Sequence, residues 1–136
     1  MTRLAAYRML VLGLAILAGS AALARQSESE PSFDRDIQPI FDLRCATCHN
    51  NDDPVGGLTL EMHFAYDQIV GVPSLQSGFK RVEPGNSQQS YLLHKIVGTH
   101  ISAGGTGFAM PAFTGNLIRP EEIRLIEAWI DTGAKK

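Results

Sequence analysis

The chain has 136 residues, a length typical of a single domain. Its 12 Lys and Arg against 14 Asp and Glu give a formal net charge of −2. Without a basic cluster, this composition argues against nucleic acid as a partner, and it gives the chain no electrostatic reason to lie on an anionic membrane.

Residues 1–24 have the order of a secretory signal peptide. Arg3 and Arg8 are followed by an apolar run over residues 9–17 and by small residues up to Ala24, after which we expect cleavage. The run falls short of the roughly 20 apolar residues of a spanning helix, which disfavours an uncleaved membrane anchor. We therefore expect a periplasmic or otherwise exported protein, with membrane association only through an uncleaved signal or a membrane-bound partner. Cleavage removes two basic residues and no acidic one, and the mature net charge becomes −4.

The remaining chain is predicted to be a flexible leader over residues 25–32 and one domain over residues 33–136. The leader is polar and acidic, with no apolar side chain to bury. Apolar residues at helical spacing then predict a helix over residues 33–47 that ends in the only two cysteines. Further elements are expected in this order: a turn at 50–57, a short extended segment at 58–61, a brief helix at 62–70, a loop at 72–85, a helix at 87–97, a glycine-rich loop at 98–116 and a last helix from 120 to 133.

The two cysteines, Cys45 and Cys48, occupy one helical turn, and His49 follows directly in the sequence CATCH. Three interpretations are open: a redox dithiol, half of a zinc site, or the attachment site of a covalent haem. A dithiol would need the pair at a helix N-terminus, where the macrodipole lowers a thiol pKa, but here the pair closes a predicted helix.

A zinc site has some support, because fourteen residues separate Cys48 from His63. The second histidine of such a site is missing, since positions 67–69 hold Asp, Gln and Ile. Haem attachment requires CxxCH, and every position of this motif is present. We therefore predict one covalently bound haem c, held by Cys45 and Cys48 with His49 as an axial ligand of the iron.

The chain resembles a class I c-type cytochrome, and more closely the small planctomycete-type cytochrome c domains. Over roughly residues 36–134 the matching segments, in order, are DIQPIFDLRCATCH, GGLTL, EPGNSQQSYLLHKIVG, AMP and LIEAWIDTGA. The resemblance implies an all-α fold: a small cytochrome c-like helical bundle around one haem, with long loops. The first and last helices would cross beside the haem, with Phe41 and Trp129 as candidates for their contact.

The resemblance also bears on the second axial ligand. The family commonly supplies a methionine from the glycine-rich loop, and Met110 in Ala-Met-Pro occupies that place. The alternatives in this chain are Met62 and the histidines His63, His94 and His100, of which His100 is best placed because it lies in the same loop.

These features predict an exported monohaem cytochrome that transfers single electrons as a carrier or as the electron-transfer subunit of an oxidoreductase complex, without being an enzyme itself. Redox proteins are the expected partners, docking through basic or largely apolar surfaces because the chain is acidic. Two alternatives remain: a haem sensor or small peroxidase-like protein whose glycine-rich loop releases the distal ligand, and a haemless adhesion module.

Overall fold

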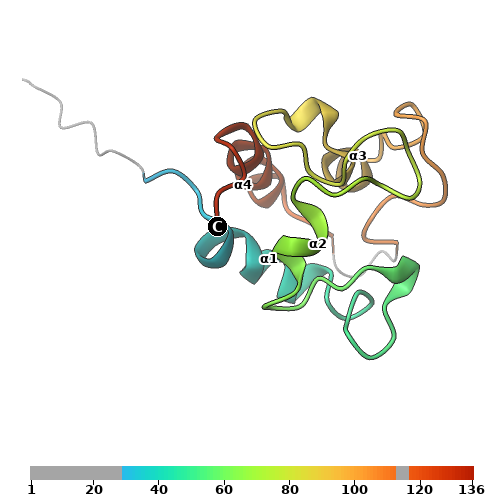
Figure 1. The fold of residues 1–136 in the computed structure, drawn as a ribbon, viewed down its shortest axis with the longest axis horizontal. Helices are drawn as coiled ribbons and strands as arrows, with labels where there is room; N and C mark the ends of the chain where they lie inside the picture. Colours follow the sequence, from blue (N-terminus) through green and yellow to red (C-terminus); the bar gives the residue numbers. More distant parts are fainter. Residues whose placement is uncertain (1–28, 113–116) are drawn as a thin grey trace, which may run out of the picture.

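The computed structural model describes residues 29–112 and 117–136 of the chain (Figure 1). Its helices are α1 (Gln38–Arg44), α2 (Ala65–Ile69), α3 (Tyr91–Val97) and α4 (Pro120–Asp131), with a π-helical turn and two 3₁₀ turns at Phe33–Ile37, Val55–Gly57 and Ser87–Gln89. The described part of the chain contains isolated β-bridges but no strand. The prediction of a helical fold with long loops is confirmed for these residues.

The predicted signal peptide, residues 1–24, lies outside the described residues, as do residues 25–28 of the predicted leader. Across 29–112 and 117–136, no helix has both the length and the apolar character needed to cross a membrane.

Pro39 divides the first predicted helix into two pieces. The turn Phe33–Ile37 is π-helical, and the N–H of Gln38 donates to the carbonyl of Phe33, five residues back. Because proline has no N–H of its own, the helical hydrogen-bond pattern cannot run regularly through this point. The wider turn directs Phe33 and Ile37 into the core.

α1 ends at Arg44, before the cysteine pair, whereas the predicted helix ran to residue 47. The N–H groups of Cys45 and Ala46 both donate to the carbonyl of Phe41, at 2.8 and 2.9 Å. This shared acceptor closes the last turn of the helix. The cysteines therefore lie in a turn directly after the C-terminus of α1.

Two later helices are also shorter than predicted. α2 begins at Ala65, so the predicted helix over 62–70 starts too early. The predicted helix over 87–97 is broken at Ser90, whose backbone is extended at φ −100° and ψ 112°. There the N–H of Tyr91 donates to the carbonyl of Lys80 at 2.9 Å, so a contact with a distant segment replaces a helical hydrogen bond.

The core joins the first helical turn to α4. The ring centroid of Phe33 lies 5.8 Å from that of Phe41, 5.4 Å from that of Trp129 and 5.2 Å from that of Tyr66. Trp129 is fully buried, and its indole N–H donates to the carbonyl of Lys135 at 2.8 Å. Phe33 therefore links the two residues expected at the helix crossing. The rest of this cluster consists of Ile37, Ile40, Leu60, Ala65, Ile69, Val82, Ile126, Ile130 and Ala134.

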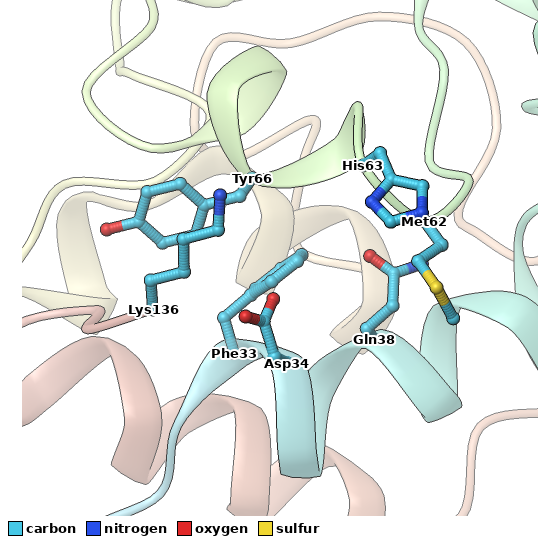
Figure 2. A pocket seen from close by; sticks show the side chains of 7 residues that line it. All are labelled: Phe33, Asp34, Gln38, Met62, His63, Tyr66 and Lys136. Atoms are coloured by element: carbon cyan, nitrogen blue, oxygen red, sulfur yellow. The ribbon is translucent and has the colours of Figure 1, made fainter.

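A cavity of about 300 Å³ lies beside this core, between the first helical turn and the start of α2 (Figure 2). Phe33 and Tyr66 supply its aromatic lining, and Gln38, Met62 and His63 are among the other residues that line it. Neither cysteine lines this cavity, nor do His49 and Met110. It is therefore separate from the predicted haem site.

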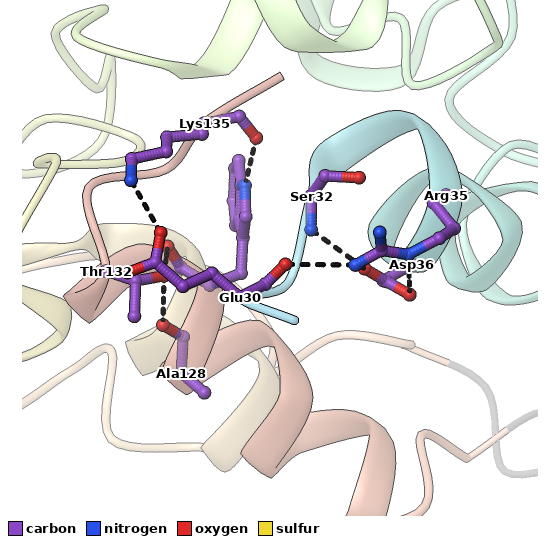
Figure 3. Close-up of polar contacts among 8 residues, drawn as sticks. Glu30, Ser32, Arg35, Asp36, Ala128, Thr132 and Lys135 are labelled. Carbon is purple, nitrogen blue, oxygen red and sulfur yellow. Dashed lines mark hydrogen bonds and ion pairs between the residues drawn. The ribbon is translucent and has the colours of Figure 1, made fainter. Parts of the chain in front are cut away.

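Hydrogen bonds and an ion pair connect the first described residues to the last residues of the chain (Figure 3). The N–H of Phe33 donates to the carbonyl of Lys135 at 2.9 Å, and the ammonium of Lys135 pairs with Glu30 at 2.6 Å. Arg35 adds contacts with the carbonyl of Glu30 and the carboxylate of Asp36. Exposed ion pairs contribute little to stability, so the buried Phe33 ring and its backbone hydrogen bond hold the start of the domain in place.

Candidate functional site

Cys45, Cys48 and His49 share one tight turn at the end of α1. The carbonyl of Cys45 accepts hydrogen bonds from the N–H of Cys48 at 3.1 Å and of His49 at 3.0 Å. Both cysteines are free thiols; Cys48 is exposed, and Cys45 is partly buried against the core. The structure thus brings together three of the four predicted site residues.

The imidazole of His49 is oriented by the loop that follows the turn. Its Nδ1 lies 3.0 Å from the carbonyl oxygen of Val55 and 3.2 Å from that of Leu58. Carbonyl oxygens only accept hydrogen bonds, so Nδ1 carries the proton and Nε2 of the neutral ring keeps a free lone pair. Metal-binding histidines are commonly fixed in this way, by a hydrogen bond on the nitrogen that does not bind the metal. Two cysteine thiols beside such an imidazole are the side chains that a covalently attached haem requires, the thiols for attachment and the imidazole to bind the iron.

Burial raises the pKa of the Cys45 thiol to about 12. This thiol is therefore protonated at neutral pH, whereas a redox-active dithiol relies on a thiolate. Cys45 is therefore not suited to be the nucleophilic thiolate of a dithiol pair.

The zinc interpretation also lacks a site. Among residues 29–112 and 117–136, no three or more His, Cys, Asp or Glu side chains come together in a way that could hold a metal ion. His63 instead lines the cavity beside α2, together with Met62 (Figure 2). The structure therefore does not join His63 to the cysteine turn.

The other two candidate histidines, His94 and His100, form hydrogen bonds with residues close to them in the chain. Nδ1 of His94 lies 2.8 Å from the hydroxyl of Thr99, and Nε2 lies 2.9 Å from the carbonyl of Gln88, so His94 has no free ring nitrogen. Nε2 of His100 donates to the carbonyl of Gly107 at 2.9 Å. Nδ1 of His100 is buried and has no hydrogen-bond partner among the described residues.

Met110 lies in the glycine-rich loop, which returns alongside α3. Its N–H donates to the carbonyl of Lys95 at 2.9 Å. The ammonium of the same lysine donates to the carbonyls of Thr106 and Phe108, both at 2.9 Å. Met110 is therefore positioned by α3, while the cysteines and His49 are positioned by α1. Sequence patterns did not single out Lys95; the available signal was a lysine on the apolar side of a helix.

A partly buried ion pair connects the cysteine turn to α4. The guanidinium of Arg44, the residue before Cys45, lies 3.1 Å from the carboxylate of Glu122. Glu122 also accepts hydrogen bonds from the backbone N–H and the guanidinium of Arg119, at 2.8 and 2.9 Å. Burial alone would raise the pKa of Glu122, but the hydrogen bonds from Arg44 and Arg119 outweigh it and lower the pKa to about 2. Glu122 also lies in the first turn of α4, where a negative charge is favourable.

Comparison with known proteins gives a distant relationship. No family model matches the chain. The chain is 30% identical over 123 aligned residues to hydrazine synthase subunit alpha of Kuenenia stuttgartiensis, covering 76% of this chain and 15% of that subunit. The solved structure of Kuenenia stuttgartiensis hydrazine synthase aligns with 76% of this chain and 16% of its own, at a TM-score of 0.55 and 25% identity.

The chain therefore spans about 15% of the length of the curated relative that it matches. This relationship corrects one expectation. The prediction that the chain is not an enzyme is wrong, because the relative is a subunit of a synthase. The chain is distantly homologous to one part of that enzyme subunit.

Proposed function

We propose that this chain carries one covalent haem c and transfers single electrons as the electron-transfer part of an oxidoreductase. Cys45 and Cys48 would hold the porphyrin through thioether bonds, and Nε2 of His49 would bind the iron. Met110 would be the ligand on the opposite side. When bound, the haem supplies a reversible ferrous–ferric couple.

The orientation of His49 carries this proposal. Two backbone carbonyls hold this imidazole at Nδ1, so that Nε2 is available to bind a metal, and Cys45 and Cys48 lie in the same turn. A methionine opposite the histidine would raise the reduction potential and leave no open position on the iron for a substrate.

Exposed apolar side chains on the same segments support a large apolar cofactor. Val55, beside the His49 ring, is 52% exposed, while Ile101 and Phe108 on the Met110 loop are 61% and 78% exposed. A bound porphyrin would provide an apolar surface against which these side chains could pack.

The similarity to part of hydrazine synthase subunit alpha supports a role within an enzyme rather than as a free carrier. The partners would then be redox proteins, or other parts of a larger assembly, that present basic or apolar docking surfaces. The predicted signal peptide supports a location of such an assembly outside the cytoplasm.

Haem attachment is tested by expressing the full chain for export together with a cytochrome c maturation system. We expect one haem that remains bound under denaturing conditions, detected by protein mass and by the absorption spectrum. The double variant Cys45→Ser/Cys48→Ser should carry no covalent haem. A wild-type product of unmodified mass would rule out the proposed cofactor.

The distal ligand is tested with Met110→Ala. We expect the oxidised variant to lose the long-wavelength methionine-to-iron band and its reduction potential to fall, because water or a weaker ligand replaces the sulfur. Met62→Ala, which changes the exposed methionine beside the separate cavity, is the matched control and should behave as wild type. Rapid binding of carbon monoxide by the reduced wild-type protein would contradict a closed iron and favour the sensor alternative.

A further inference from the structure

We propose that Lys95, assisted by His100, is a positioning residue that holds the loop over residues 104–110 so that the Met110 sulfur stays within reach of the iron. This inference rests on the proposed ligation by Met110. It assigns a role to a buried lysine that sequence patterns left without one.

Lys95 binds the loop at three points. Lys95 is only 9% exposed, and its ammonium donates to the carbonyls of Thr106 and Phe108, both at 2.9 Å. Its own carbonyl accepts the N–H of Met110 at 2.9 Å. One residue of α3 therefore fixes the backbone at Met110 itself and at two of the four residues before it.

His100 and Tyr91 complete the support on the same side. Nε2 of the buried His100 donates to the carbonyl of Gly107 at 2.9 Å, and the carbonyl of His100 accepts the N–H of Gly105 at 2.8 Å. Gly105 lies so close to the ring of Tyr91 that a Cβ atom there would overlap the Tyr91 hydroxyl. The loop thus rests directly on α3, and only glycine fits at the point of contact.

These contacts constrain the course of the backbone and leave the side chains of the loop free. The lysine and histidine donate only to carbonyl oxygens, and the side chains of Thr106 and Phe108 are exposed. A loop held in this way can direct the Met110 side chain towards a ligand without using its own side chains as anchors. Holding a ligand in place before the metal binds lowers the ordering cost of ligation.

The free-energy cost of burying the Lys95 ammonium distinguishes a positioning role from a purely stabilising one. A buried ammonium that meets carbonyl oxygens and the Tyr91 ring, at 5.6 Å from the ring centroid, is costly to desolvate. Replacing Lys95 by an apolar side chain removes that cost, and the two carbonyls that it releases belong to the exposed residues Thr106 and Phe108. Loss of Lys95 should therefore free the loop more than it destabilises the fold.

The test uses the haem-loaded full chain with Lys95→Met, which keeps a long apolar side chain but no donor. We expect a smaller methionine-to-iron band in the oxidised protein and at least tenfold faster carbon monoxide binding by the reduced protein, with a nearly unchanged melting temperature. Lys95→Arg, which keeps the charge and the donors, should recover most of the band. Lys80→Met is the matched control, because the Lys80 ammonium is half-exposed and pairs with Glu83 rather than with the loop.

Gly105→Ala provides a second route to the same loop. It pushes the loop away from Tyr91 while Lys95 stays intact, and it should also reduce the band; Gly78→Ala is its control, because a Cβ at Gly78 meets no atom within 4 Å. A full band and slow carbon monoxide binding in Lys95→Met, or in Gly105→Ala if the lysine variant does not fold, would overturn the positioning role alone. Absence of the band from the wild type would overturn Met110 ligation as well.

Discussion

Glu122 couples the residue before the cysteine turn to the first turn of α4. Its buried carboxylate accepts hydrogen bonds from Arg44 and Arg119, which together hold its pKa at about 2, well below the ordinary 4.5. A carboxyl whose pKa is lowered by folding stabilises the folded state fully above its unfolded pKa. That contribution is lost progressively as the pH falls from about 4.5 towards 2.

Glu122→Gln should therefore destabilise the protein by about 2 kcal/mol at pH 7, because two guanidinium groups lose their charged acceptor. Urea unfolding of wild type and variant should show this difference at pH 7 and a smaller one at pH 3. Glu121→Gln is the matched control, since the Glu121 carboxylate is exposed and 3.3 Å from Arg119. It should change stability by less than about 0.5 kcal/mol. Equal effects of the two substitutions, or a difference independent of pH, would contradict the role assigned to Glu122.

Among the elements, α4 was predictable because its signals are local. Pro120 begins it, an apolar stripe with Ile126 and Trp129 faces the core, and Gly133 follows its end with φ 104°. The helices that were predicted too long are interrupted by features that a pattern of apolar residues does not reveal. Ser90 is drawn into an extended conformation by the bridge to Lys80, and Pro39 changes the hydrogen bonding of an otherwise regular apolar stripe.

The same distinction applies to the candidate site. The turn with Cys45, Cys48 and His49 could be predicted as a unit because five consecutive residues contain it. The support of Met110 could not, because the Lys95 ammonium reaches carbonyls 11 and 13 residues further along the chain. The hydrogen bonds that orient His49 are likewise accepted by backbone carbonyls, which the order of side chains in the sequence does not reveal.

For the molecule as a whole, the proposed haem would be part of the core as well as the redox centre. The described core has one main cluster, built around Phe33 and α4, while the segments that carry His49 and Met110 leave large apolar side chains exposed. Small domains have little hydrophobic stabilisation to spare. A cofactor that binds only the folded chain adds its binding free energy to stability, and covalent attachment keeps it at a high effective concentration.

We therefore expect the haem-loaded chain to melt at least about 10 °C above the same wild-type chain produced without haem attachment and kept reduced, which corresponds to roughly 2 kcal/mol for a domain of this size. Circular dichroism at a helix-sensitive wavelength measures both transitions, and using one sequence avoids the effect of replacing the partly buried Cys45. The largest loss of order in the haem-free chain should fall on the turn after α1 and on the Met110 loop, detected as faster amide hydrogen exchange there than around Trp129. Equal melting temperatures and equal exchange in the two forms would mean that the fold is complete without haem, and that the exposed apolar side chains serve a different contact.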